Sequence, residues 1–127
     1  MKRATREWVR KAEDDYEAAG ELSGSSKRLH DQVCFLSQQS CEKYFKAILE
    51  EHGHLIPKSD DVDRLLWMLI PSHGTLGVFR RRLLFLNQFA VETRYPDKFA
   101  RKRQAVSAYR WAGRVRTACR SILRLRV

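Results

Sequence analysis

Five polar side chains recur at steps of three and four residues in an otherwise largely apolar segment near the middle of the chain. They are Gln38, Gln39, Glu42, Lys43 and Lys46. Such spacing places side chains on one side of a helix. Two ammonium groups beside side-chain amides, together with the guanidinium of Arg94 from a neighbouring helix, would form a cleft for an anion. The sequence therefore predicts nucleotide or phosphate binding at Gln39, Lys43, Lys46 and Arg94.

The same residues also allow a purely structural interpretation. An ion pair between Glu42 and Arg94 would fasten the corner between the fourth and the last helix, and we favour this role for those two residues. It would leave Lys46 as the more available phosphate ligand. The amides of Gln38 and Gln39 could instead join helices across a dimer seam.

The last 30 residues carry all of the excess positive charge. The net charge is +10, yet residues 1–97 hold as many acidic as basic residues, and residues 98–127 hold ten basic residues and no acidic one. Such a block attracts phosphates or an acidic protein surface. A tryptophan among the arginines could stack on a base or on a guanidinium, although core or interface is its commoner place. The predicted nucleic-acid contacts are Arg110, Arg114, Arg116, Arg120, Arg124 and Trp111. The alternative is a solvated face that the acidic first helix partly neutralises.

Other chemistries find little support in the sequence. His52 and His54 lack a third metal ligand at suitable spacing, and Asp60, Asp61 and Asp63 are typical of a helix N-terminus. The three cysteines include no CxxC pair and suit buried thiols better than a disulfide or a catalytic thiol. No glycine-rich phosphate loop is present. We therefore expect no metal, no cofactor and no catalytic residue.

The elements that must position these residues are helices, because apolar residues recur at helical spacing almost throughout. The predicted helices cover residues 4–22 and 27–52, a short stretch capped by Ser59 or Asp60, residues 76–93, and residues 97–124 with Pro96 and Asp97 at the start of the last one. The expected stripe of the last helix is Ala105, Ala108, Ala112, Val115, Cys119 and Ile122. This pattern predicts an all-α, up-and-down bundle of four to five helices.

Length and hydropathy bound the organisation of the chain. With 127 residues and no linker or internal repeat, we expect a single domain over residues 1–127. The longest apolar run, residues 65–70, is far shorter than the roughly 20 residues that cross a bilayer. We expect a cytoplasmic protein that does not contact a membrane.

Three segments, in order and at familiar spacing, carry a resemblance to a known family. They are QQSCEKYFKA at residues 38–47, PKSDDV at residues 57–62 and TRYPD at residues 93–97, preceded by Trp8, Ala12 and Asp15. The chain resembles the HEPN family (higher eukaryotes and prokaryotes nucleotide-binding) along nearly its whole length. The first segment is similar to the family's QQ-x-x-EK-x-x-KA signature, and the last matches its TRYPD motif.

The resemblance implies a helical bundle that forms homodimers and that pairs with a minimal nucleotidyltransferase in toxin–antitoxin-like systems. Many family members are metal-independent ribonucleases that use an Arg followed four to six residues later by a His. This chain has no such pair. It also has Asp60 where many relatives of this subtype have His, and a carboxylate repels phosphate.

We therefore predict a non-enzymatic nucleotide- or RNA-binding HEPN module. One alternative is a ribonuclease toxin with a non-standard site, using Arg94 with His30 or Tyr95. Another is a protein-interaction subunit that docks an acidic partner through its basic last helix.

Overall fold

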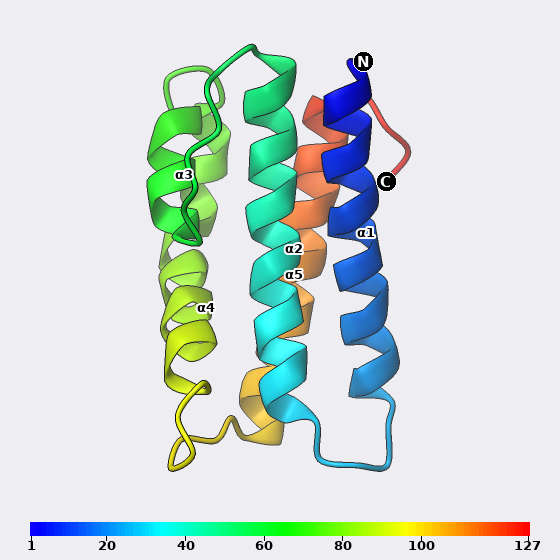
Figure 1. Cartoon of the computed structure of the whole chain (residues 1–127), viewed down its shortest axis with the longest axis vertical. Coiled ribbons are helices and arrows are strands. Elements are labelled where there is room, and N and C mark those ends of the chain that lie inside the picture. Colours follow the sequence, from blue (N-terminus) through cyan, green and yellow to red (C-terminus); the bar gives the residue numbers. More distant parts are fainter.

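The computed structural model describes all residues, 1–127, and confirms an all-α bundle without strands (Figure 1). Its elements are α1 (Arg3–Ser23), α2 (His30–Glu51), α3 (Val62–Leu69), the 3₁₀ helix η1 (Gly74–Phe79), α4 (Arg80–Glu92) and α5 (Lys102–Ile122). The chain runs up and down, so both termini lie at one end, and the α1–α2 and α4–α5 connections lie at the other (Figure 1). No helix is both long enough and apolar enough to span a bilayer.

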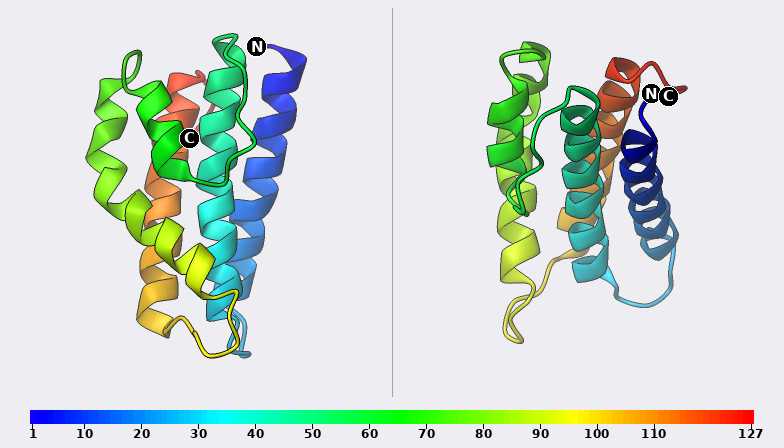
Figure 2. Two further views of the ribbon diagram at one scale, coloured as in Figure 1. Left: turned by 60° about the vertical axis from the view of Figure 1, so that its left-hand side comes forward. Right: turned by 45° about the horizontal axis from the view of Figure 1, so that its top comes forward.

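Helix α2 forms the centre of the bundle. It packs against α1, α3, α4 and α5 (Figure 2). Residues 33–49 of α2 are therefore mostly buried, and the predicted stripe of Cys34, Cys41, Phe45, Ile48 and Leu49 lies in the core. All three cysteines of the chain are buried and unpaired.

Small residues allow α1 and α5 to pack side by side. The predicted alanine-rich stripe of α5 is buried from Ala105 to Cys119, and Ile122 is half-buried at its end. Tyr16 of α1 and Tyr109 of α5 stack with their ring centroids 4.9 Å apart. Each phenol hydroxyl lies against a glycine of the opposite helix, where a Cβ atom would approach it to less than 3 Å.

Apart from the start of α5, the helix boundaries differ from the prediction at three places. Helix α2 begins at His30 rather than at residue 27. Asp61, and not Ser59 or Asp60, caps α3, because its carboxylate accepts hydrogen bonds from the backbone N–H groups of Asp63 and Arg64. The predicted fourth helix begins as a 3₁₀ helix and becomes α-helical at Arg80.

The largest difference lies at the start of α5. Pro96 and Asp97 do not begin this helix, which starts at Lys102 after a loop over residues 93–101. The carboxylate of Asp31 in α2 accepts a hydrogen bond from the backbone N–H of Ala100 (2.6 Å) and so holds the loop in place. The backbone N–H of Arg101 donates to the side chain of Gln104 (2.7 Å), which fixes the first turn.

Candidate anion and nucleic-acid interface

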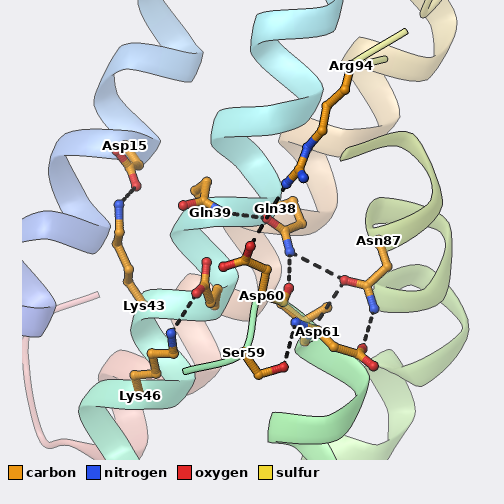
Figure 3. Close-up of polar contacts among 12 residues, drawn as sticks. Asp15, Gln38, Gln39, Lys43, Lys46, Ser59, Asp60, Asp61, Asn87 and Arg94 are labelled. Atoms are coloured by element: carbon orange, nitrogen blue, oxygen red, sulfur yellow. Dashed lines mark hydrogen bonds and ion pairs between the residues drawn. The ribbon is translucent and has the colours of Figure 1, made fainter. Parts of the chain in front are cut away.

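The two lysines of the predicted phosphate site already have carboxylate partners. Lys43 Nζ lies 2.5 Å from Asp15 Oδ2 in α1, and Lys46 Nζ lies 2.7 Å from Glu42 Oε1 one turn earlier in α2 (Figure 3). Lys46 is only 7% exposed and also lies over the ring of Trp8. Helical spacing placed these side chains together as predicted, but neither ammonium group is free.

Arg94 pairs with a different carboxylate from the one we favoured. The expected ion pair between Glu42 and Arg94 is wrong, because Glu42 binds Lys46 on its own helix. Arg94 Nη2 instead lies 3.9 Å from Asp60 Oδ2, and the two side chains are 56% and 70% exposed. The segment before α3 brings Asp60 to the end of α4 (Figure 3). An exposed pair at this distance is weak.

The two carboxylate oxygens of Glu42 have different surroundings. Oε1 binds Lys46, whereas Oε2 is buried without a hydrogen-bond partner. Burial raises the pKa of this carboxyl group, although Lys46 opposes the shift. The Glu42–Lys46 pair is thus an internal feature of the bundle rather than an open anion site.

The glutamines of the same strip hold three segments together. Gln38 Nε2 donates to the backbone oxygen of Asp60 (2.6 Å) and lies 3.3 Å from Asn87 Oδ1, while Gln39 Nε2 donates to Gln38 Oε1 (2.9 Å) (Figure 3). Asn87 Nδ2 in turn donates to Asp61 Oδ1 (2.6 Å). Nothing in the sequence pattern singled out Asn87, because its partners lie 25 residues or more away along the chain.

A groove of about 660 Å³ lies beside this network. Its charged lining residues are Lys58, Asp60, Asp61 and Arg94. The two cations are balanced by two carboxylates, so the groove does not favour a polyanion.

Two of the predicted nucleic-acid contacts face α1 instead. Arg116 forms two hydrogen bonds of 2.7 Å with the carboxylate of Glu13, and Arg120 Nη1 lies 3.5 Å from the same carboxylate. The Tyr44 hydroxyl donates to Glu13 as well. Glu13 therefore joins α1, α2 and α5, and it draws both arginines toward the inside of the bundle.

Trp111 stacks on guanidinium groups rather than standing alone at the surface. The guanidinium carbons of Arg82 and Arg114 lie 4.6 Å and 4.7 Å from the centroid of its ring, and Phe79 contacts it edge-on. The ring is half-buried between α4 and α5. Arg110 and Arg114 remain exposed, and Arg124 lies exposed beyond the end of α5.

Free cations gather at the end of the bundle away from the termini. We call this surface the basic end, and its members are Lys27, Arg28, Arg101, Lys102, Arg103 and Arg110. All six are exposed, and none forms an ion pair. They come from the α1–α2 loop, from Arg101 directly before α5 and from the first half of that helix, which lies beside the loop (Figures 1 and 2).

Three neighbouring cavities lie along the basic end, and Lys102 lines each of them. One of about 330 Å³ is lined by Arg28, His30, Asp31, Phe99, Ala100, Arg101 and Lys102. One of about 460 Å³ lies between the α1–α2 loop and α5, and one of about 620 Å³ extends along α5 to Arg110. The sequence signal for this surface was the runs Lys27-Arg28 and residues 101–103, which flank two helix starts.

The sequence and the fold of this chain both match those of one known family. A family model described as "HEPN domain" matches residues 5–122. The chain belongs to the HEPN family. The crystal structure of an archaeal HEPN homologue superimposes on this HEPN domain with a TM-score of 0.72 at 26% sequence identity, covering 95% of this chain and 98% of that one. No curated protein matches it.

The family motifs of this HEPN domain lie close together in space. Asp60 of PKSDDV pairs with Arg94 of TRYPD, and the backbone oxygen of Asp60 accepts from Gln38 of QQSCEKYFKA. The three sequence segments that carried the resemblance therefore form one network that fixes α2, α3 and α4 relative to each other.

Proposed function

We propose that this HEPN domain is a non-enzymatic RNA-binding module that holds the phosphate backbone at its basic end. The observation that supports the proposal is the set of six exposed cations without an ion-pair partner, arranged around three neighbouring cavities. Phosphate contacts by Lys and Arg supply most of the sequence-independent affinity for nucleic acids. The N-terminal end of the α5 dipole lies at the same place and adds positive potential.

Electrostatics favours the basic end over the polar strip as the phosphate site. A cation with a carboxylate partner must give up that partner before it can bind phosphate, and Lys43 and Lys46 both have one. Of the four residues predicted to bind a nucleotide, only Arg94 is an exposed cation, and Asp60 lies beside it. Binding of a mononucleotide by Gln39, Lys43, Lys46 and Arg94 stays a prediction.

The proposal includes an assembly that rests on the family resemblance. We propose a homodimer and, as its partner protein, a minimal nucleotidyltransferase in a toxin–antitoxin-like system. The basic end lies at the end of the bundle opposite the chain termini (Figure 1). A partner that binds elsewhere on the bundle would leave it accessible to RNA.

One observation favours cleavage of RNA as a second candidate function. His30 lines the 330 Å³ cavity together with Arg28, Arg101 and Lys102. An imidazole can act as a general acid or base, while neighbouring cations stabilise the charge on a reacting phosphate. Arg94, by contrast, does not line this cavity.

A third candidate is docking of an acidic protein on the same cations. It differs from RNA binding in its salt dependence, because affinity for a polyanion falls linearly with salt concentration on logarithmic axes as counterions are released.

The test is a titration of a labelled, unstructured RNA with the purified protein over a series of salt concentrations, with a denaturing gel of each sample. We expect salt-sensitive binding and intact RNA. Replacing Arg101→Gln, Lys102→Gln and Arg103→Gln together should lower the slope of log affinity against log salt by about 2, since each lost contact to a single strand removes roughly 0.7.

A matched control removes the same charge elsewhere. Arg3, Arg6 and Arg10 are exposed on α1 and form no ion pair, so replacing all three with Gln changes the net charge equally. This control should change the slope by much less. Equal losses in the two triple variants, or no binding of RNA at low salt, would overturn the proposal, and shortened RNA would favour the ribonuclease.

A further inference from the structure

An exposed aromatic ring stands at the wall of the smallest cavity of the basic end. Phe99, in the α4–α5 loop, is 75% exposed and lines the 330 Å³ cavity beside Arg28 and Arg101. A phenyl ring exposed to this degree gives little to the stability of the fold. Its position among free cations therefore calls for another explanation.

The loop that carries this ring is held to the bundle. The backbone N–H of the next residue, Ala100, donates to Asp31 Oδ1 at the start of α2, and Ala100 itself is buried. Asp31 is the one carboxylate that lines the cavity, and this hydrogen bond occupies one of its oxygens. The backbone beside the ring is thus held in place before any ligand binds, which lowers the entropic cost of ordering the loop on binding.

The cavity combines the two groups that single-stranded nucleic acids require. Bases of a single strand stack on aromatic side chains, while a positively charged groove follows the phosphates. Arg28, Arg101 and Lys102 can contact phosphates on either side of a nucleotide whose base lies on Phe99. In a duplex the bases cover one another, so this ring would have no free face to contact.

We propose that the 330 Å³ cavity is a subsite for one unstacked nucleotide of single-stranded RNA, with the base on Phe99 and the adjoining phosphates on Arg28, Arg101 and Lys102. This inference rests on the proposed function and narrows its substrate to single strands. The strand continues through the cavities that share Lys102 and leaves along α5 toward Arg110.

The test compares Phe99→Ala with Tyr95→Ala. Tyr95 is the other exposed aromatic residue of the loop, 60% exposed, and it does not line the cavity. We expect Phe99→Ala to weaken binding of an oligouridylate about fivefold to a hundredfold, which corresponds to the loss of one base stacked on an aromatic ring. Tyr95→Ala and Phe99→Trp should bind nearly as the unchanged protein does.

Two further probes separate stacking from electrostatics. A strand of the same length without bases should bind equally to the unchanged protein and to Phe99→Ala, and so should a duplex RNA. The salt slope should not change, because Phe99→Ala removes no charge.

The outcomes distinguish this subsite from the proposed function. If Phe99→Ala binds oligouridylate unchanged while the triple variant at residues 101–103 loses affinity, the subsite is wrong and RNA binding at the basic end stands. If Phe99→Ala weakens binding of the duplex or of the strand without bases as much as it weakens binding of oligouridylate, the proposed stacking of a base on Phe99 is wrong. If neither variant loses affinity, both proposals fall.

Discussion

The carboxylate of Glu13 joins three helices of the bundle through its polar contacts. It accepts two hydrogen bonds from Arg116 and one from the Tyr44 hydroxyl, and Arg120 lies close by. Bidentate, charge-assisted pairs are among the stronger polar contacts in proteins. Because Arg116 and Arg120 pair with Glu13, these two arginines of α5 stabilise the bundle and are not free to bind a ligand.

This arrangement makes stability depend on pH in a defined direction. Burial disfavours the charged form of Glu13, but the hydrogen bonds from Arg116 and Tyr44 outweigh it, so its pKa is lowered in the folded protein. A carboxyl group whose pKa is lower when folded stabilises the fold above its unfolded pKa, about 4.5, and this contribution is lost as the pH falls through the folded value.

We therefore expect Glu13→Gln to lower the free energy of unfolding at pH 7 by about 1–3 kcal/mol and to flatten its decline below pH 4.5. Thermal melts between pH 3 and pH 7 measure both effects. Glu17→Gln is the matched control, because Glu17 is exposed on the same helix and has no ion-pair partner. A parallel decline in the two variants would contradict the role of Glu13.

At the residue scale the sequence predicted neighbours on one helix but not partners across helices. Gln39, Lys43 and Lys46 lie together on α2, as their spacing indicated. Their charge state was not predictable, because Asp15 comes from another helix and the preference of Glu42 for Lys46 over Arg94 depends on how α4 ends. The basic end was predicted only in part, because the sequence pointed to the basic residues 98–127 and to Arg110 but not to Lys27 and Arg28, which join this surface from the distant α1–α2 loop.

Among the elements, the start of α5 matters most for function, because it positions the basic end. The loop over residues 93–101 depends on few contacts, and the hydrogen bond from Ala100 to Asp31 links it directly to α2. Because Pro96 and Asp97 are suited to the first turn of a helix, the sequence predicted that α5 begins at residue 97, five residues before its actual start at Lys102. The tertiary contact with Asp31, which spacing alone does not reveal, decides the boundary.

Removing this contact should loosen the loop without unfolding the bundle. We expect Asp31→Ala to cost about 1 kcal/mol in the free energy of unfolding and to speed hydrogen exchange of the Ala100 amide, while the amides in the middle of α2 change little. Exchange measured by NMR shows this directly. Asp14→Ala, at an exposed position on α1 without a hydrogen bond, should leave the Ala100 amide unchanged, and slow exchange at Ala100 in Asp31→Ala would rule out the tether.

For the helices themselves, periodicity was a sufficient guide. The apolar stripes of α2 and α5 lie in the core as predicted, because helical spacing is a local property that burial requires. The 3₁₀ turn of η1 was not predictable in the same way, since a short tight turn and the first turn of an α-helix share one apolar pattern.

At the scale of the whole molecule, some cations of α5 form ion pairs within the bundle and others are exposed without a partner. Toward the C-terminus of α5, Arg116 and Arg120 share the single carboxylate of Glu13, whereas Arg101, Lys102, Arg103 and Arg110 at its beginning have no ion-pair partner. A group of exposed cations without ion-pair partners therefore lies at the basic end, while Arg114 and Arg124 are also exposed and unpaired farther along the chain. Such a distribution steers a polyanion toward that end and orients it there.

The proposed homodimer is also a property at this scale. We expect light scattering during size-exclusion chromatography to give twice the mass of one chain. Leu84 and Val91, which are exposed on α4 beside the 660 Å³ groove, are the apolar side chains that we would substitute first to locate the dimer contact. A mass equal to one chain at high micromolar concentration would contradict the dimer.

The buried thiols have a practical consequence for following how this protein works. Burial raises the pKa of Cys34 and of Cys41 to about 12 and that of Cys119 well above its ordinary value, so none of the three is a thiolate at neutral pH. Maleimide reagents react with accessible thiolates, so we expect them not to label these three cysteines. The unchanged chain should therefore give no background labelling. One cysteine introduced at Ser107, in the wall of the 620 Å³ cavity, would carry a single fluorophore that tests for the proposed binding of RNA.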